Sequence, residues 1–207
     1  MKKIVIVGQG GHSKVIKDII IASKEYQIYA LLDDKYDKPT QKDKIIYAPI
    51  SYANVLCSEK EIYFNIAIGD NSVRKKVGKM LDDIGVQFAI LKHPTAVISP
   101  SVEIGRGSVI MPNCVVNADT VIGEHVIINS SSVIEHDNQI NGYVHISPKA
   151  VLTGNVYVGE GTQIGAGATV IPNIKIGDWS MVGAGATVVS DIPSKVTVVG
   201  VPAKIIS

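Results

Sequence analysis

The segment GAGATV occurs twice in the chain, at residues 165–170 and again at residues 183–188. The two copies start 18 residues apart and lie within a longer pattern, in which a branched aliphatic residue recurs every six residues. Neither the 3.6-residue period of an α-helix nor the two-residue period of a strand gives this spacing, whereas a coil with three flat sides does. The pattern therefore predicts a β-solenoid with 18 residues per coil. Its sixteen aliphatic positions are Ile98, Ile104, Ile110, Val116, Ile122, Ile128, Ile134, Ile140, Ile146, Leu152, Val158, Ile164, Val170, Ile176, Val182 and Val188.

A smaller residue accompanies each aliphatic one. Four positions after the first fifteen members of the pattern, the residue is Ser, Thr, Ala or Val in 12 cases, and the exceptions are Cys114, Asn138 and Ile174. We therefore expect one large and one small side chain to point inward from every wall of the coil. With strands stacked roughly 4.8 Å apart, about five coils would make a rod roughly 24 Å tall.

The first half of the chain follows different rules. Residues 1–92 hold 26 charged side chains and the remaining 115 residues hold only 13, so we predict a domain boundary near His93-Pro94. Apolar strands are predicted at residues 3–7, 29–32 and 62–68, and a glycine turn at 8–11 precedes a helix at 12–23. Asn71 or Ser72 is the expected cap of a further helix that ends before Gly85. This alternation predicts a small Rossmann-like α/β domain over residues 1–92, followed by the all-β solenoid over residues 93–207 with a short C-terminal tail.

Composition and charge exclude several classes of protein. Twenty basic and 19 acidic residues give a net charge of +1, and no basic tract points to nucleic acid. The sequence contains no run of 18 apolar residues, which a membrane-spanning helix would need. The amino end passes directly into the first predicted strand rather than into a signal peptide. Cys57 and Cys114 form no metal-ligand spacing. We therefore expect a cytoplasmic protein whose partners are small molecules, with both cysteines as packed thiols.

Several motifs carry a resemblance to a known family. The unbroken hexapeptide register resembles the left-handed parallel β-helix of hexapeptide-repeat acyltransferases. Further motifs narrow the match, namely Val7-Gly8-Gln9-Gly10-Gly11-His12, Leu32-Asp33-Asp34, Ile66-Ala67-Ile68-Gly69-Asp70-Asn71, His93-Pro94, Val133-Ile134-Glu135-His136-Asp137 and Gly200-Val201-Pro202-Ala203-Lys204. With these motifs, essentially the whole chain resembles one subgroup, the sialic-acid O-acetyltransferases and nucleotide-4-amino-sugar N-acetyltransferases. This resemblance implies a homotrimer with acetyl-CoA sites between neighbouring β-helices.

His136 is the expected catalytic residue. An imidazole with an ordinary pKa of about 6.5 is suited to accept the proton that a sugar amine loses as it attacks a thioester. The residues one coil away, Ala118 and Gly154, are small and leave room for a substrate. Asp137 matches the acidic residue that orients this histidine in the family, and a carboxylate on one ring nitrogen would fix the tautomer. The alternative interpretation is a solvated turn histidine.

The resemblance also implies where acetyl-CoA is held. It makes His145 a contact of the cofactor across the trimer interface, and it assigns backbone contacts with the pantetheine to Ala166 and Ala184. Lys204 lies in a tail segment similar to one near the adenine-phosphate end. The small residues have a structural explanation as well, because they permit tight turns and close packing of coils. His93 and His125 are expected to be surface or packing residues.

The glycines at the start of the chain indicate an anion site. Gly8-x-Gly10-Gly11 lies between a strand and a helix, which places backbone N–H groups at a helix N-terminus. Ser13 stands where a dinucleotide fingerprint has its third glycine, so an NAD-dependent dehydrogenase is excluded. A tight turn with a solvated acidic loop is the plain alternative. The resemblance assigns the nucleotide-sugar contacts to Gly10, Gly11, His12, Asp33, Asp34 and Gly69.

Together these observations predict an acetyltransferase that moves the acetyl group of acetyl-CoA to the amine of a UDP-linked 4-amino sugar in surface glycan biosynthesis. Direct transfer is expected, without a metal. Two alternatives stay open, namely O-acetylation of a sugar hydroxyl, as in sialic acid, and a non-catalytic nucleotide-sugar-binding protein. A zinc site of the carbonic anhydrase type is disfavoured, because His125, His136 and His145 are not separated by multiples of 18.

Overall fold

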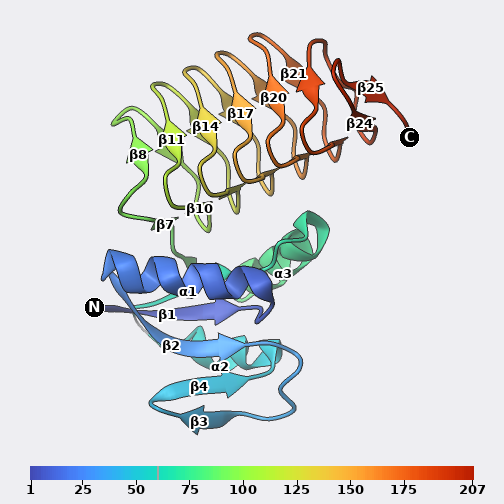
Figure 1. Ribbon diagram of the computed structural model, residues 1–207. Helices are drawn as coiled ribbons and strands as arrows, with labels where there is room; N and C mark the ends of the chain where they lie inside the picture. Colours follow the sequence, from blue (N-terminus) through green and yellow to red (C-terminus); the bar gives the residue numbers. More distant parts are fainter. Residues whose placement is uncertain (60) are drawn as a thin grey trace. The chain divides into compact units, whose positions relative to one another are not determined.

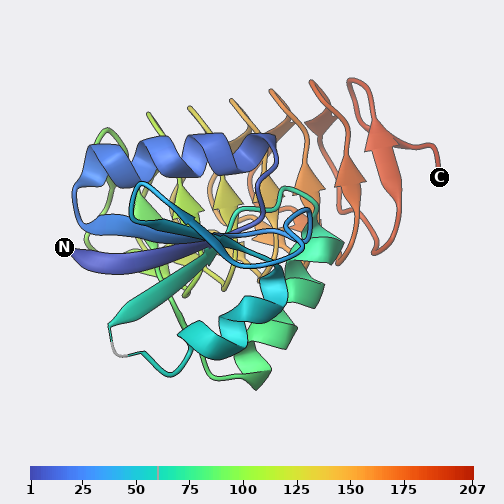
Figure 2. The same cartoon turned by 90° about the horizontal axis from the view of Figure 1, so that it is seen from below.

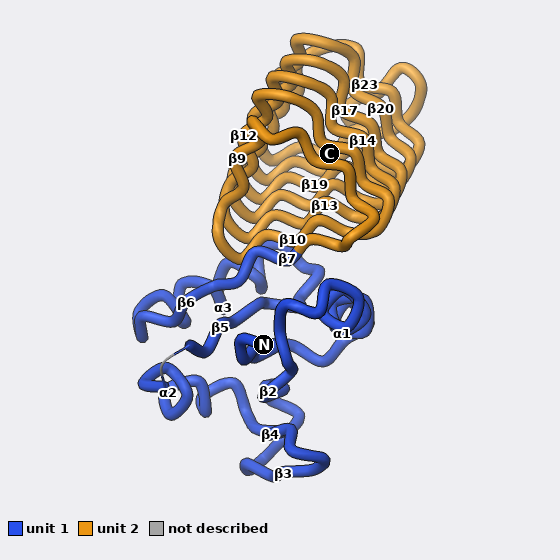
Figure 3. The backbone as a smooth tube through the Cα atoms, turned by 90° about the vertical axis from the view of Figure 1, so that its left-hand side faces the viewer, with its two compact units in different colours: residues 1–91 blue, residues 92–207 orange. Residues whose placement is uncertain are grey.

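The computed structural model describes residues 1–59 and 61–207 (Figure 1). These residues form two compact units, Met1–Leu91 and Lys92–Ser207, which are coloured separately in Figure 3. The first unit combines helices with a sheet, and the second is built from short strands. None of the helices in the described part of the chain is both long and apolar enough to cross a membrane.

The first unit is a six-stranded sheet in the order β3-β4-β2-β1-β5-β6 with helices on both faces. Figure 2 shows helix α1 on one face and helices α2 and α3 on the other. The predicted Rossmann-like fold is therefore confirmed. Its elements are β1 (Lys2–Val7), α1 (Gly11–Ser23), β2 (Tyr26–Leu32), β3 (Thr40–Lys42), β4 (Ile45–Ala48), a 3-10 turn (Ile50–Tyr52), α2 (Ala53–Leu56), β5 (Ile62–Ile66), α3 (Asn71–Asp83) and β6 (Gln87–Phe88).

Strand β1 lies in the middle of this unit and is buried on both faces, as expected for a central parallel strand. Its side chains alternate between the two faces. Val5 and Val7 belong to one apolar cluster with Phe64 of β5 and Leu81 of α3. Ile4 and Ile6 point to the opposite face, and both are fully buried. This packing fixes the carboxyl ends of the strands, which carry the turns of the sequence motifs.

The structure corrects three details of the sequence-based expectation. The cap of α3 is Asp70, whose Oδ1 accepts a hydrogen bond from the N–H of Val73 at 2.9 Å, so the prediction of Asn71 or Ser72 is wrong. Strand β5 ends at Ile66 rather than at residue 68. The sheet also contains one antiparallel pair, β3 with β4, which was not predicted.

The second unit is a regular three-walled coil. Between Val97 and Val199, neighbouring strands of each wall pair in parallel one coil apart, so that Val115, for example, lies beside Val133. The first wall consists of β7 (Leu91–Lys92), β10 (Val109–Ile110), β13 (Ile127–Ile128), β16 (His145–Ile146), β19 (Gln163–Ile164), β22 (Met181–Val182), β24 (Thr197–Val199) and β25 (Lys204–Ile205). The second wall consists of β8 (Val97–Ile98), β11 (Val115–Val116), β14 (Val133–Ile134), β17 (Val151–Leu152), β20 (Thr169–Val170) and β23 (Thr187–Val188). The third wall consists of β9 (Glu103–Ile104), β12 (Val121–Ile122), β15 (Gln139–Ile140), β18 (Tyr157–Val158) and β21 (Lys175–Ile176). The terminal pair of the first wall, β24 with β25, is antiparallel.

The aliphatic pattern of the sequence forms the interior of this coil. From Ile110 to Val188, every residue of the six-residue pattern is exposed by 2% or less. The residue before it is exposed or half-buried in these strands, except for Val109 and Ile127 of the first wall, which are buried. The predicted left-handed parallel β-helix of hexapeptide repeats is confirmed, and Figure 1 shows its coils stacked from β8 to the C-terminal end.

The walls meet at corners that require left-handed backbone. Between the second and third walls, the corner residues are Asp119, Asp137, Asn155 and Asn173, with φ between 55° and 64°. Asp and Asn tolerate this conformation better than most residues because their short polar side chains bond locally. His136 precedes Asp137 and therefore lies at one of these corners.

Replacing Ile128 or Ile146 by Ala should destabilise the second unit. Both side chains are fully buried between neighbouring coils, and the coils above and below prevent the cavity from collapsing. We expect a loss of about 2–5 kcal/mol in the free energy of unfolding, measured by chemical denaturation. Val121→Ala is the matched control, because Val121 is 42% exposed on the third wall, and its cost should be about 1 kcal/mol or less. Equal effects for the buried and the exposed positions would contradict the assignment of the interior.

Candidate functional site

His136 and Asp137 form a hydrogen-bonded pair on the surface of the coil. The Nδ1 atom of His136 lies 2.6 Å from Oδ2 of Asp137, and the two side chains are 61% and 58% exposed. When the imidazole is neutral, its proton lies on Nδ1 facing the carboxylate and leaves a lone pair on Nε2. The geometry thus presents Nε2 as a base in an exposed position. The orienting contact expected from the sequence is present, and the catalytic role remains a prediction.

The backbone of this corner is tied to the coils on both sides. The N–H of Asp137 donates to the carbonyl of Ala118, and the N–H of Asn155 donates to the carbonyl of His136, both at 3.0 Å. The imidazole lies over Gly154, where an added Cβ would be only 2.7 Å from Cε1 and Nε2 of the ring. Any side chain at this position would displace the imidazole. The absence of a side chain at Gly154 therefore allows the imidazole of His136 to occupy its position.

Two polar residues that the sequence analysis did not assign support the same corner. Asn138 is buried, and its Nδ2 donates to the carbonyls of Glu135 and Thr153 at 2.5 and 3.0 Å. Glu135 accepts a hydrogen bond from Nδ2 of Asn117 at 2.7 Å. The only sequence signal was that Asn138 interrupts the row of small inward residues. The amide of Asn138 occupies this inward position because it donates hydrogen bonds to backbone carbonyls of the corner.

His145 lies on the first wall rather than at the corner of His136. Its Nε2 is 3.0 Å from Nδ2 of Asn129, which can only donate, so this ring nitrogen accepts when the imidazole is neutral. Asn129 is held in turn because its Oδ1 accepts the N–H of Ser130 at 2.8 Å. The two histidines thus lie at different places on the coil, His136 at the corner of the second and third walls and His145 on the first wall. The predicted contact of His145 with a ligand stays a prediction.

Ala166 and Ala184 lie one above the other at the corner between the first and second walls. The N–H of Gly185 donates to the carbonyl of Ala166 at 2.9 Å, which fixes the stacking of the two coils. Both alanines are exposed. A Cβ added at Gly167 or Gly185 would meet nothing within 4 Å. This corner therefore leaves its backbone accessible along two successive coils.

In the first unit, the six residues assigned to nucleotide-sugar binding line one cavity of about 570 Å³. They come from the ends of β1, β2 and β5, because the carboxyl ends of neighbouring parallel strands meet at one edge of a sheet. A Cβ added at Gly10, Gly11 or Gly69 would meet nothing within 4 Å, so these glycines border open space. The complete lining is Gly8, Gln9, Gly10, Gly11, His12, Asp33, Asp34, Ile50, Ala67, Ile68 and Gly69.

The two aspartates of this cavity also hold its loops. Oδ2 of Asp33 accepts the N–H of Gln9 at 2.6 Å, which ties the end of β2 to the glycine turn. Oδ1 of Asp34 accepts the N–H of Ile50 at 3.0 Å. Each carboxylate keeps further acceptor capacity for a ligand. The plain interpretation as a solvated acidic loop is incomplete, because both side chains are bonded to backbone.

His12 is the titratable ring of the cavity. Burial, and after it the positive charge of Arg74, lowers the pKa of His12 from 6.5 to about 4. Its Nε2 is buried and makes no hydrogen bond within the described residues. The imidazole is therefore neutral near pH 7. A neutral ring can donate a hydrogen bond to a ligand but supplies no charge.

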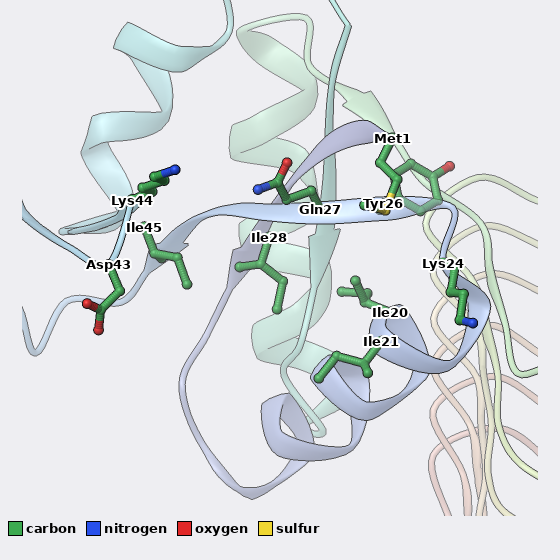
Figure 4. Close-up of a pocket in the computed structure, with 10 residues that line it drawn as sticks. All are labelled: Met1, Ile20, Ile21, Lys24, Tyr26, Gln27, Ile28, Asp43, Lys44 and Ile45. Carbon is green, nitrogen blue, oxygen red and sulfur yellow. The ribbon is translucent and has the colours of Figure 1, made fainter.

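A second cavity of the first unit, of about 400 Å³, contains none of the predicted site residues (Figure 4). Figure 4 shows the side chains of Ile20, Ile21, Ile28 and Ile45 around it. Its lining lacks a glycine turn and comes from the carboxyl end of α1 and from β2, away from the motifs described above. We assign no chemistry to this cavity.

Two further histidines lie in the second unit. His93 is half-buried, with its Nδ1 2.9 Å from Oγ1 of Thr95. The ring of His125 is buried and stacks on Tyr143 with the ring centroids 5.1 Å apart. This agrees with the prediction of a packing residue. Over residues 1–59 and 61–207, no group of three or more His, Cys, Asp or Glu side chains is placed to hold a metal ion.

Comparison with known proteins gives matches to both units. The PglD N-terminal domain matches residues 3–81, and the bacterial transferase hexapeptide (six repeats) matches residues 101–136 and 155–190. UDP-N-acetylbacillosamine N-acetyltransferase of Bacillus subtilis (strain 168) is 47% identical over 113 residues. That aligned stretch is 54% of this chain and 52% of the relative, so the match spans about half the length of that protein.

Two solved structures match over nearly their whole length. The acetyltransferase domain of PglB from Neisseria gonorrhoeae FA1090, in complex with acetyl coenzyme A, is 36% identical, with 99% of each chain covered and a TM-score of 0.92. PerB from Caulobacter crescentus, in complex with CoA and GDP-perosamine, is 38% identical, with 100% of this chain and 98% of the other covered and a TM-score of 0.91. On these grounds, the chain belongs to the family of nucleotide-sugar N-acetyltransferases built on hexapeptide repeats.

Proposed function

We propose that this chain transfers the acetyl group of acetyl-CoA to the amine of a UDP-linked 4-amino sugar, as a step in surface glycan biosynthesis. The observation that carries the proposal is the 2.6 Å contact between His136 and Asp137 at an exposed corner of the β-helix. Its support is family membership, since relatives were solved with acetyl-CoA and with a nucleotide-linked amino sugar. Both substrates are soluble metabolites of the cytoplasm, and we place the enzyme there.

His136 acts as the general base in this proposal. As the amine nitrogen forms its bond to the thioester carbonyl carbon, Nε2 of His136 takes the amine proton, and Asp137 stabilises the resulting imidazolium. The tetrahedral intermediate then breaks its C–S bond. The imidazolium returns the proton to the sulfur, which leaves as free CoA. The products are the N-acetylated sugar and CoA, and His136 is neutral again.

The first unit supplies the nucleotide-sugar site. The N-terminus of α1 begins at Gly11 with Gly10 as its cap, and no side chain caps it. Its free N–H groups and the helix dipole favour an anion, which suits a diphosphate. The carboxylates of Asp33 and Asp34 are suited to accept hydrogen bonds from ribose hydroxyls or from a base N–H. Gly10, Gly11, His12 and Gly69 form the rest of this proposed site.

The corner of Ala166 and Ala184 fits acetyl-CoA. Pantetheine amides need backbone donors and acceptors along an extended path, and the exposed backbone of two stacked coils offers them. The open space beside Gly167 and Gly185 admits the ligand. His145, held by Asn129, is the proposed side-chain contact.

We also propose that the active form is a homotrimer that packs on its second walls. The outward residues of this wall are uncharged and β-branched, whereas the third wall carries Glu103 and Lys175. The outward residues of the second wall are Val97, Val115, Val133, Val151, Thr169 and Thr187. A ladder of four valines and two threonines without a charge suits a buried interface.

The two proposed sites border this same wall. His136 lies at the corner where the second wall meets the third, and Ala166 lies at the corner where it meets the first. When three copies face one another around a threefold axis, one corner of each copy approaches the other corner of its neighbour. The base and the acetyl-CoA contacts of one active site then come from different chains.

Val151→Glu should break the trimer. It places a carboxylate in the middle of the proposed interface, where its desolvation is costly. We expect light scattering after size exclusion to give a trimer for the wild type and a smaller species for this variant, with loss of acetyl transfer. The matched control is Val121→Glu, because Val121 faces outward on the third wall and should keep the trimer. A monomeric wild type, or a trimeric Val151→Glu, would refute this interface.

The proposed reaction is tested by following thiol release from acetyl-CoA and the mass of the acceptor. The acceptors are a UDP-4-amino sugar, a GDP-4-amino sugar and free sialic acid. We expect the UDP-linked amine to gain one acetyl group. His136→Ala should lower kcat/KM by roughly 100-fold to 10,000-fold, which is the usual effect of removing a general base, with trimer and UDP binding intact.

Each alternative has its own outcome in this assay. Acetylation of sialic acid alone would replace the proposed reaction by O-acetylation. Saturable UDP-sugar binding without consumption of acetyl-CoA would indicate a non-catalytic binding protein. Full activity of His136→Ala would remove His136 from the mechanism whatever the acceptor.

Gly154→Ala should reduce turnover without unfolding the protein. The added methyl group would lie 2.7 Å from the ring of His136 and would push it away from its position. A displacement of about 1 Å can cost on the order of 100-fold in kcat. Gly142→Ala is the matched control, because its Cβ would meet its nearest neighbour, the carbonyl oxygen of Glu124, at 3.4 Å. If both variants have wild-type kcat, the position of His136 over Gly154 is unimportant.

A further inference from the structure

Arg74 is a buried cation behind the nucleotide-sugar cavity. It belongs to the first turns of α3, and only 1% of it is exposed. A guanidinium stays charged at any pH that a protein experiences. The residue does not line the cavity itself. A charged side chain this deeply buried is costly unless its contacts compensate for the lost hydration.

The contacts of Arg74 lead to the wall of the cavity. Nη1 donates to the carbonyl oxygens of Ile68 and Gly69, both at 3.0 Å. Nη2 donates to Oδ1 of Asn71 at 2.8 Å. Ile68 and Gly69 line the cavity, whereas Arg74, which binds their carbonyl oxygens, does not line it. Arg74 thus fixes the orientation of two consecutive peptide groups.

The planarity of the peptide determines where the opposite ends of these groups point. In a trans peptide, the N–H lies on the side away from the preceding C=O. With the carbonyls of Ile68 and Gly69 directed to Arg74, the N–H groups of Gly69 and Asp70 are directed to the other side. A Cβ added at Gly69 would meet nothing within 4 Å, so space for a ligand is present there.

The charge of Arg74 also acts on His12, a residue that lines the cavity. It contributes, after burial, to the lowered pKa of His12. Of the other charged groups, Asp33 and Asp34 line the same cavity, Lys17 of α1 is hydrogen-bonded to Gln9 of the lining, and Asp70 caps α3 directly after Gly69. Because His12 is neutral, the positive charge that is hydrogen-bonded directly to the Ile68–Gly69 segment is that of Arg74.

We propose that Arg74 is a positioning residue for the diphosphate of the substrate. It turns the Ile68–Gly69 segment so that two backbone N–H groups face the ligand, and it adds a positive charge behind them. The ligand class, a nucleoside diphosphate, rests on the proposed function, but the binding test does not require acetyl transfer.

Arg74→Met, Arg74→Lys and the control Lys79→Met test this role through binding of UDP and of pyrophosphate to the full-length protein, measured by calorimetry. Arg74→Met loses the charge and the hydrogen bonds to Ile68, Gly69 and Asn71, and we expect UDP to bind about 10-fold to 100-fold more weakly. Arg74→Lys keeps the charge but not the planar fork, and its loss should be smaller. Lys79 is an exposed residue of the same helix, so Lys79→Met should bind as the wild type does.

Titration of the His12 ring by NMR separates this role from a merely structural one. In Arg74→Met the pKa of His12 should rise above its wild-type value, and in Arg74→Lys it should remain low. A residue needed only for folding would change the thermal stability of both variants without distinguishing their His12 titrations.

The inference is overturned if folded Arg74→Met binds UDP as tightly as the wild type, or if the wild type binds neither UDP nor pyrophosphate. If Arg74→Met does not fold, Arg74→Lys is the deciding variant. Wild-type affinity of Arg74→Lys for UDP would refute the positioning role. Weaker UDP binding by Arg74→Lys, with an unchanged pKa of His12, would support that role. UDP binding that depends on Arg74 in a protein that transfers no acetyl group would refute the proposed function and leave this inference standing.

Discussion

The backbone hydrogen bonds that join each coil to the next determine the architecture of the second unit. From β8 to β23, every wall repeats its pairing at a shift of 18 residues, as in the pair of Ile127 with His145 and of His145 with Gln163. A residue's position within the repeat therefore determines whether it is interior, on a wall or at a corner. Because these bonds run through backbone, side chains at the exposed positions are free to vary. The scaffold can carry chemistry without losing its core.

The corner that carries His136 combines two properties, since the side chains of His136 and Asp137 are exposed and its backbone is hydrogen-bonded to both neighbouring coils. Asp137 adopts left-handed backbone with φ of 59°, and the neighbouring coils bond the corner from either side. His136 is consequently held by the backbone while its ring faces solvent. Its position depends on the absence of a side chain at Gly154, one coil away. An ordinary surface loop would offer an exposed histidine neither backbone hydrogen bonds on both sides nor a fixed space for its ring.

Much of this arrangement is encoded in simple sequence patterns. The six-residue period identifies the interior, and the position of His136 between Ala118 and Gly154 follows from counting in steps of 18. The six cavity residues of the first unit could be grouped in advance, because glycine turns and acidic strand ends recur at one edge of a parallel sheet. Local rules thus recover most of the fold and the main groups of the site.

Other features depend on contacts that no local rule predicts. The turn between β3 and β4 uses Asp43 and Lys44, both with positive φ, and it lacks the glycine that usually marks such a hairpin. Arg74 stands beside two lysines in sequence and resembles a solvated residue until the carbonyls of the cavity wall are seen around it. The partners Asn129 and Glu135 likewise become visible only when coils are stacked.

A crystal structure of the protein with CoA and a UDP-linked 4-amino sugar would test the central claim most directly. That claim is that the corner of the β-helix holds the imidazole of His136 as the base for the attacking amine. The measurement is the distance from Nε2 of His136 to the amine nitrogen. We predict about 2.6–3.2 Å, or one bridging water, with the sulfur of CoA beside the same amine. An amine bound elsewhere, with no direct or water-mediated path to His136, would contradict the account.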